Sequence, residues 1–157
     1  MFLRSLFTSR IILIGVLLFT NITILQANEV VSEKKELENV LNGYANAYLF
    51  GDIKRYNELV HGDRFGIGSS GNYLTNDYFT NNARRMKNSE FVRYKETKIK
   101  IESVRLSKKK VVAIVDSVWF SRGYDIEADS EFSTTWNVIF VLRKEESSWR
   151  IIGSIGM

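Results

Sequence analysis

Hydrophobic residues change their spacing near residue 90, and this change constrains the fold more than any other feature of the sequence. Before it, apolar residues recur every three or four positions; after it, they recur at every second position. The second half therefore predicts four strands rich in β-branched and aromatic residues: Arg93–Leu106, Val111–Ser121, Glu131–Lys144 and Trp149–Ile155. The connections between them are short and polar, which predicts an antiparallel meander.

The region before the strands predicts three helices: Val30–Phe50, Ile53–His61 and Asn76–Asn88. Ser32 and Asp52 are placed to cap the first two. Phe65–Tyr73 is rich in glycine and serine, and it predicts a short strand with a tight turn. Helices followed by an antiparallel sheet indicate an α+β fold in which the N-terminal helices pack on a curved antiparallel sheet.

Residues 1–27 have the pattern of a signal peptide. Arg4 and Arg10 precede the apolar run Ile11–Phe19, and Ala27 is a small residue before the expected cut. We expect cleavage to leave one domain, residues 28–157, that is exported, either periplasmic or secreted, and has no membrane anchor. The alternative, an uncleaved anchor, is disfavoured because the apolar run is shorter than the ~20 residues that span a bilayer.

Charge and residue usage exclude several functional classes. The chain has 22 Lys and Arg against 18 Asp and Glu; without Arg4 and Arg10 the basic count is 20, a net charge of +2. This small excess, with no concentrated basic face, does not predict nucleic-acid binding. There is no cysteine and only one histidine, so we expect no metal site. The glycines at 66–71 lack the Lys-Ser/Thr ending of a phosphate loop, and we expect no cofactor.

A few anchor residues and the order of elements resemble the NTF2-like superfamily, in particular its SnoaL-like, DUF4440-type branch. The anchors are Tyr48-Leu49-Phe50-Gly51-Asp52 at the end of the long helix and the final segment Lys144–Ile151. The resemblance implies a cone (cystatin-like) in which a bent sheet wraps the long helix and leaves a pocket at the wide end. It also implies frequent dimers through the open sheet face. Its members include isomerases, dehydratases, cyclases and plain binding modules, so the resemblance implies no single chemistry.

Asp116 is the candidate catalytic residue. It interrupts a run in which every second neighbour is apolar: Val112, Ile114, Val118 and Phe120. On a buried face its charged form would be disfavoured, which raises the pKa of a carboxyl group toward that of a useful general base. The alternative is an acid that points outward at a sheet edge or pairs with a lysine. Both interpretations remain open at this point.

The candidate ligand-binding residues are mostly aromatic: Tyr48, Tyr56, Trp119, Trp136 and, as the polar member, Asn137. Together with Tyr44 they can line a pocket for a flat or apolar ligand, with Asn137 orienting a ligand carbonyl. Aromatic residues at helical spacing more often form a plain core, and a pocket and a core are compatible in this fold. His61, the only histidine, either forms a dyad with Asp63 or complements the dipole at the end of the second helix.

Two functions are consistent with the sequence. The first is a non-catalytic exported module that binds a small apolar or aromatic molecule, or a partner protein. The second is a cofactor-free enzyme of the isomerase, dehydratase or cyclase type, with Asp116 as general base for proton transfer. They differ in whether Asp116, Asn137 and the tyrosines face one cavity. We also expect a homodimer, because Val111–Phe120 is apolar on both faces and needs cover on both.

Overall fold

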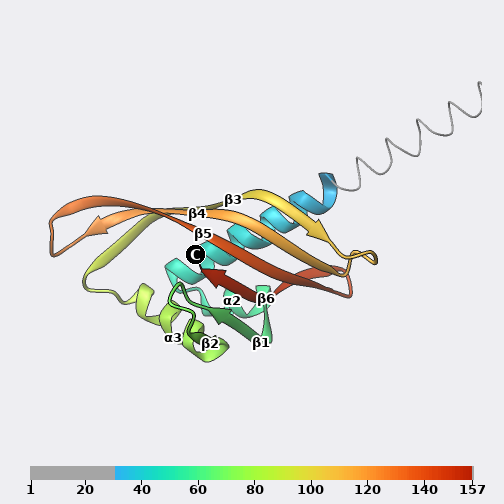
Figure 1. Ribbon diagram of the computed structural model, residues 1–157. Helices are drawn as coiled ribbons and strands as arrows, with labels where there is room; N and C mark the ends of the chain where they lie inside the picture. Colours follow the sequence, from blue (N-terminus) through green and yellow to red (C-terminus); the bar gives the residue numbers. More distant parts are fainter. Residues whose placement is uncertain (1–30, 157) are drawn as a thin grey trace, which may run out of the picture. The chain divides into compact units, whose positions relative to one another are not determined.

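The computed structural model describes residues 31–156 (Figure 1). The signal peptide predicted for residues 1–27 lies outside the described residues. The chain divides into two compact units, Met1–Lys35 and Glu36–Met157, and the architecture below is that of the second. Within residues 31–156 no helix is both long and apolar enough to cross a membrane.

The elements follow in the order helices first, strands second. A helix covers residues 31–50. It is followed by α2 (Ile53–Leu59), β1 (Val60–Ile67), β2 (Tyr73–Thr75), α3 (Asn76–Lys87), β3 (Val92–Leu106), β4 (Val112–Asp125), β5 (Ser130–Glu145) and β6 (Ser148–Gly156). The three predicted helices and four predicted long strands are all present, so the predicted α+β class is confirmed.

One sheet contains all six strands, in the order β2-β1-β6-β5-β4-β3. The strands from β3 to β6 pair antiparallel in chain order, which confirms the predicted meander. The sheet as a whole is mixed, because β1, which was expected only as a short strand with a turn, pairs parallel with β6. Figure 1 shows β1 beside the C-terminal strand, so the last strand in chain order lies inside the sheet.

The second predicted helix is shorter than expected. It begins after Asp52, whose side chain caps it by accepting a hydrogen bond from the Arg55 backbone N–H (3.0 Å), as predicted. It ends at Leu59 rather than His61, because Val60 is already extended and pairs with Ile151 of β6. Parallel pairing with a central strand outweighs the helical spacing of Val60, so β1 begins five residues before the predicted strand.

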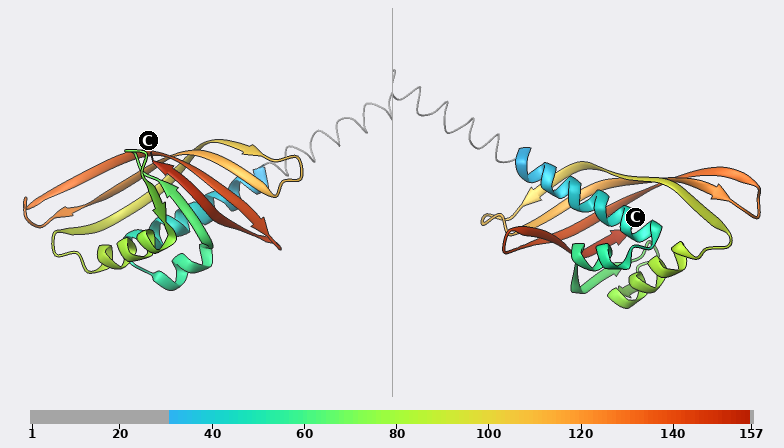
Figure 2. Two further views of the ribbon diagram at one scale, coloured as in Figure 1. Left: turned by 60° about the horizontal axis from the view of Figure 1, so that its bottom comes forward. Right: turned by 180° about the vertical axis from the view of Figure 1, so that it is seen from behind.

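The helices and the sheet form two layers with the core between them. Residues 36–50, α2 and α3 lie against one face of the curved sheet (Figure 2). Leu37, Leu41 and Tyr44 of the long helix are buried against residues of the inner sheet face, among them Ile99, Val115, Phe140, Leu142 and Ile151. Trp149, the second residue of β6, is only 2% exposed and lies within this core.

Asn42 fastens the long helix to the edge strand β3. Its side-chain amide donates to the Ile99 carbonyl (3.2 Å) and accepts from the Ile99 N–H (2.8 Å). An edge strand leaves a row of backbone groups unpaired, and buried unpaired groups are costly. The two bonds satisfy one such pair and set the position of the helix residues that follow, including Tyr44 and Tyr48.

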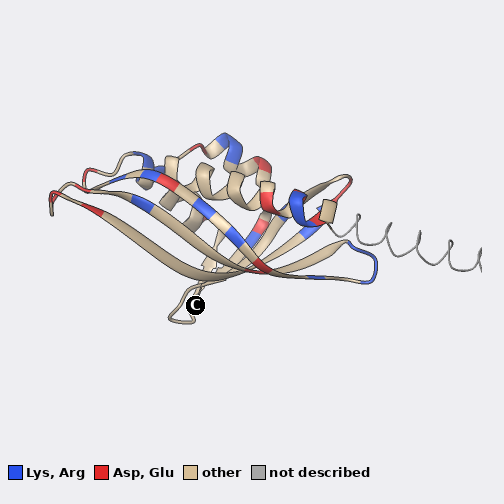
Figure 3. Ribbon diagram, turned by 90° about the horizontal axis from the view of Figure 1, so that it is seen from above, with Lys and Arg blue, Asp and Glu red and all other residues tan. Residues whose placement is uncertain are grey.

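Alternation along β4 separates the two faces of the sheet. Its odd-numbered residues from Ala113 to Ser121 are buried on the inner face, and its even-numbered residues from Val112 to Phe120 are half-buried on the outer face. Neither the helices nor any strand covers the outer face in the described chain. In Figure 3, residues of both signs are interspersed along the strands, with no concentrated basic face in that view.

Candidate functional site: an aromatic cavity with a buried arginine

A cavity of about 350 Å³ lies between the helices and the inner face of the sheet. Its walls come from the long helix, β1, β2, α3 and the inner faces of β3 to β6. The lining residues are Tyr44, Tyr48, Leu49, Arg64, Ile67, Gly68, Ser69, Leu74, Phe79, Met86, Tyr94, Trp119, Trp136, Val138, Phe140, Ser154 and Gly156. Most are apolar or aromatic, and none is an Asp, a Glu or a His.

A ladder of aromatic rings forms one wall of the cavity. Tyr44 and Tyr48 are one helical turn apart, so both rings reach the same strand residue. Their ring centroids lie 5.7 and 5.9 Å from that of Trp119, edge to face. Trp119 in turn meets Trp136 at 5.9 Å. Trp136 is 40% exposed, so the ladder runs from the core to the rim of the cavity.

Arg64 is the only charged residue in the lining, and it is 2% exposed. Nη1 donates to the Tyr56 hydroxyl (2.7 Å), and Nη2 donates to the Tyr44 hydroxyl and to Ser154 Oγ (both 2.9 Å). Its Cζ lies 3.7 Å from the centroid of the Phe79 ring, a cation–π contact. The groups that bind the guanidinium are thus all neutral.

No carboxylate balances this charge within residues 31–156: Arg64 takes part in no ion pair there, and its buried Nε has no hydrogen-bond partner. The phenols around it stay neutral at ordinary pH. Burial raises the pKa of Tyr44 and Tyr48 and raises that of Tyr56 to about 12, although the nearby guanidinium works against each shift. The described cavity therefore has a net positive charge at its buried end.

Glycine in β1 makes the position of Arg64 possible. Arg64 and Gly66 are both buried on the inner side of this strand. A Cβ at Gly66 would lie 2.4 Å from Cζ of Phe79, so only glycine allows the Phe79 ring to lie against this strand beside Arg64. Phe79 itself is presented by α3, which Thr75 caps.

Four of the predicted ligand-binding residues gather at this cavity. Tyr48, Trp119 and Trp136 line it, and Tyr56 lies behind the lining, where its hydroxyl accepts from Arg64 and donates to Asn76 Oδ1 (3.2 Å). Trp119 Nε1 donates to Thr97 Oγ1 (2.6 Å), which fixes the indole on the cavity wall.

Asp116 and Asn137 lie on the opposite, outer face of the sheet. Asp116 is paired with Ile139 across β4 and β5, and Asn137 is paired with Val118. Asp116 accepts a hydrogen bond from Ser103 and lies 3.6 Å from Arg105 Nη2, with its side chain 35% exposed. Asn137 is exposed. The two residues therefore do not share the cavity with the tyrosines, and Asp116 has the outward, paired environment of the second interpretation, with an arginine in place of the lysine.

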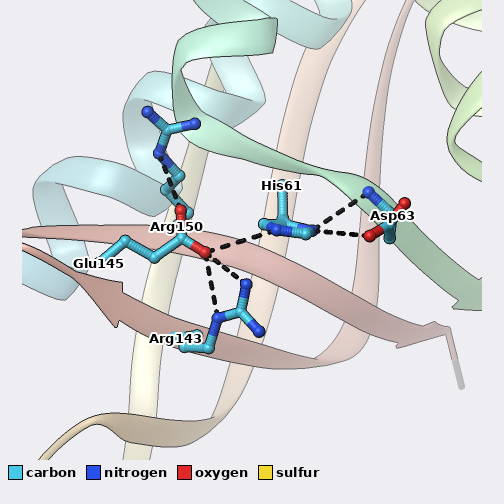
Figure 4. Close-up of polar contacts among 5 residues, drawn as sticks. All are labelled: His61, Asp63, Arg143, Glu145 and Arg150. Carbon is cyan, nitrogen blue, oxygen red and sulfur yellow. Dashed lines mark hydrogen bonds and ion pairs between the residues drawn. The ribbon is translucent and has the colours of Figure 1, made fainter.

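His61 belongs to a separate polar cluster at the other end of β1 (Figure 4). Its Nε2 lies 3.5 Å from Glu145 Oε1, and its Nδ1 accepts a hydrogen bond from the Asp63 backbone N–H (3.1 Å). Arg143 and Arg150 hold the same Glu145 carboxylate. The expectation that His61 ends a helix was wrong, since it is the second residue of β1. Within the described residues no group of His, Asp or Glu is arranged to hold a metal ion.

Arg64 is the site residue that sequence reasoning missed. A charged residue beside Asp63 and Gly62 looks like part of an exposed turn, and the strand was expected to start only at Phe65. The available signal was the alternation of Val60, Arg64 and Gly66 on one side of a strand that begins at Val60. That signal appears only after the pairing of β1 with β6 is known.

Solved structures similar to this one include NTF2-like proteins. An NTF2-like protein of unknown function from Prochlorococcus sp. NATL2A is 19% identical, with a TM-score of 0.62 over 78% of this chain and 90% of that one. A conserved protein from Planctomyces limnophilus gives 0.67 at 10% identity, over 79% and 94%. A ketosteroid isomerase-like protein from Erwinia carotovora atroseptica gives 0.57 at 17% identity, over 78% and 92%.

Comparison with protein-family models and with curated proteins gives no match. At these identities the structural similarities establish the fold alone. The chain therefore has the NTF2-like, cystatin-like α+β cone expected from the sequence, and its function has to be argued from the cavity.

Proposed function

We propose that residues 28–157 form an exported, non-catalytic module that binds a small apolar or aromatic molecule. The observation that carries this proposal is the cavity of about 350 Å³, whose size falls within the range of small-molecule sites and whose wall is the Tyr44–Trp119–Trp136 ladder. Such a wall offers a large apolar surface that is already held in place by the core.

The chemistry of the lining favours binding over proton transfer. No carboxylate or imidazole faces the cavity in the described chain, and the raised pKa values of Tyr44 and Tyr48 keep their hydroxyls protonated. Asp116, the base in the enzymatic alternative, lies across the sheet. Catalysis in this cavity would therefore lack the group on which that alternative depends.

Two further parts of the proposal come from the sequence pattern. Export is supported by the basic start and the apolar run within residues 1–27. The test is mass spectrometry of the exported protein, whose mass should correspond to a chain that begins near Asn28. Homodimer formation is supported by the uncovered outer face of β4, where Ile114 and Val118 are half-buried.

The cavity is tested by binding of the neutral apolar dye N-phenyl-1-naphthylamine. We expect its fluorescence to rise on addition of the protein, with saturation at one dye per chain. Leu74→Trp fills the cavity and should abolish the rise, because Leu74 is in the lining. Tyr73→Trp is the matched control, since Tyr73 is the neighbouring residue and is 69% exposed. Equal dye binding by both variants, each with an unchanged melting temperature, would refute the site.

A further inference from the structure

The buried end of the cavity contains hydrogen-bond donors without acceptors. A guanidinium has five N–H groups, and Arg64 uses three of them in the bonds to Tyr56, Tyr44 and Ser154. Nε is one of the two that remain, and it is fully buried. A native core rarely leaves such a donor unpaired, so this one requires an explanation.

The hydroxyls of Tyr44 and Ser154 add two more donors at the same place. Each oxygen accepts from Arg64 Nη2, which leaves its own hydrogen free to be donated. The described residues provide no acceptor for either hydrogen, whereas Tyr56 donates its own to Asn76. Tyr44, Ser154 and Arg64 all line the cavity, so the residues that carry the unused donors belong to one site.

The charge of Arg64 indicates the same ligand chemistry. A buried cation without an anion is unfavourable, and breaking a buried pair is costly for the same reason. The contact with the Phe79 ring offsets part of this cost, since a cation–π contact is strongest where the cation is removed from water. A structural arginine would normally have an acid beside it, and the lining provides none.

We propose that the cavity binds a small amphipathic carboxylic acid, with its carboxylate at Arg64, Tyr44 and Ser154 and its apolar body along Trp119 and Trp136. This inference rests on the proposed binding function and specifies its ligand class. A carboxylate brings one negative charge and acceptors only, which matches one guanidinium and two hydroxyl donors. The aromatic ladder then receives the uncharged part, from Trp119 in the core out to the half-exposed Trp136.

Three probes with one skeleton and different head groups test the inference on the intact protein: 4-phenylbutanoate, 4-phenylbutan-1-ol and 4-phenylbutylamine. Their binding is measured at pH 7 by isothermal titration calorimetry. Acetate is the control that has the carboxylate but lacks the apolar part. We expect the acid to bind roughly 10- to 100-fold more tightly than the alcohol, because a hydrogen bond to a charged group contributes about 1.5–3 kcal/mol. The amine and acetate should not bind measurably.

Variants then locate the head group. Tyr44→Phe and Ser154→Ala each remove one donor and keep the shape of the cavity, and each should reduce the preference for the acid over the alcohol several-fold. Arg64→Met should abolish that preference while the alcohol still binds. Tyr124→Phe is the control, because it removes a phenol that bonds Asp129 outside the cavity and should leave all affinities unchanged. If Arg64→Met does not fold, the other two variants decide.

The outcomes separate the two proposals. Equal affinity for acid and alcohol would overturn the carboxylate inference and leave the apolar cavity standing. A preference for the acid that persists in Tyr44→Phe and Ser154→Ala would place the head group elsewhere and also overturn it. Failure of all three probes and of the neutral dye to bind would refute the proposed function itself.

Discussion

Two residues show how far a single position can be read from the sequence. Trp119 was predicted at the pocket as one of the aromatic residues that can line one for a flat or apolar ligand, and it does line the cavity. Arg64 was not predicted, because a charged side chain is almost never fully buried unless it is paired. Local sequence shows neither the parallel neighbour that brings Arg64 inside nor the tyrosines that surround it.

Asp116 gives the first prediction at the residue scale. Its carboxylate is a third exposed, accepts from Ser103 and faces Arg105, and exposed ion pairs contribute at most about 1 kcal/mol. An asparagine keeps an oxygen for Ser103. We therefore expect Asp116→Asn to change the free energy of unfolding by less than about 1 kcal/mol, measured by urea denaturation, and to leave binding in the cavity unchanged.

The comparison variant for Asp116 is Ser103→Ala, which removes the other partner of the same hydrogen bond. The two variants should have similar small effects on unfolding, and their combination should cost little more than either one alone. If Asp116→Asn lost ligand binding or an enzymatic activity while its free energy of unfolding stayed unchanged, Asp116 would have a functional role.

At the scale of elements, the sequence predicts what is local and misses what is distant. The strands β3 to β6 follow one another through short turns, so their pairing can be inferred from chain order. The pairing of β1 with β6 joins Val60 to Ile151, and the sequence around Val60 does not indicate this distant partner. The helical spacing of Ile53, Tyr56 and Val60 therefore predicted a longer helix than the structure has.

The β5–β6 hairpin gives a prediction on pH dependence. The hydrogen bond from Arg143 lowers the pKa of Glu145 below 4.5, and the charges of Arg143, His61 and Arg150 act in the same direction. Because the folded-state pKa is the lower one, this contribution to stability is complete above about pH 4.5. It is lost as the pH falls through the folded-state value.

Glu145→Gln should therefore remove the part of the loss of stability that begins as the pH falls below about 4.5, measured by thermal melts from neutral to acid pH. Glu146→Gln is the matched control, because Glu146 is adjacent and exposed and takes part in no ion pair among residues 31–156. Curves for Glu145→Gln and the unmodified protein that remain parallel throughout would contradict the assignment.

At the scale of the molecule, the outer face of the sheet is the surface through which we predict that a dimer forms. Ile114 and Val118 of β4 and Ile139 and Val141 of β5 lie next to one another there, half-buried and without a covering layer in the described chain. A second copy of the same face, related by two-fold symmetry, would remove these side chains from water. We expect a dimer in sedimentation experiments at micromolar concentration.

Charge on that face should separate the copies without unfolding them. Val118→Lys and Ile139→Lys should each give monomers with a nearly unchanged melting temperature, because both side chains are already partly exposed in a single copy. Asn81→Lys on α3 adds the same charge on the helix side and should stay dimeric. A monomer for the unmodified protein would refute this interface.

The central position of β6 has a consequence for how the protein is made. Ser148–Gly156 follows every other described strand in the chain, yet it lies between β1 and β5 and supplies Ser154 to the cavity. Neither the parallel pairing of β1 with β6 nor the hydrogen bond from Arg64 to Ser154 can form on a nascent chain that has not yet reached this strand. Such late, long-range closure slows folding. A chain that has not yet reached β6 therefore lacks a central strand of its sheet and stays unfolded, the state that passage through a translocation channel requires, in agreement with the export that we propose.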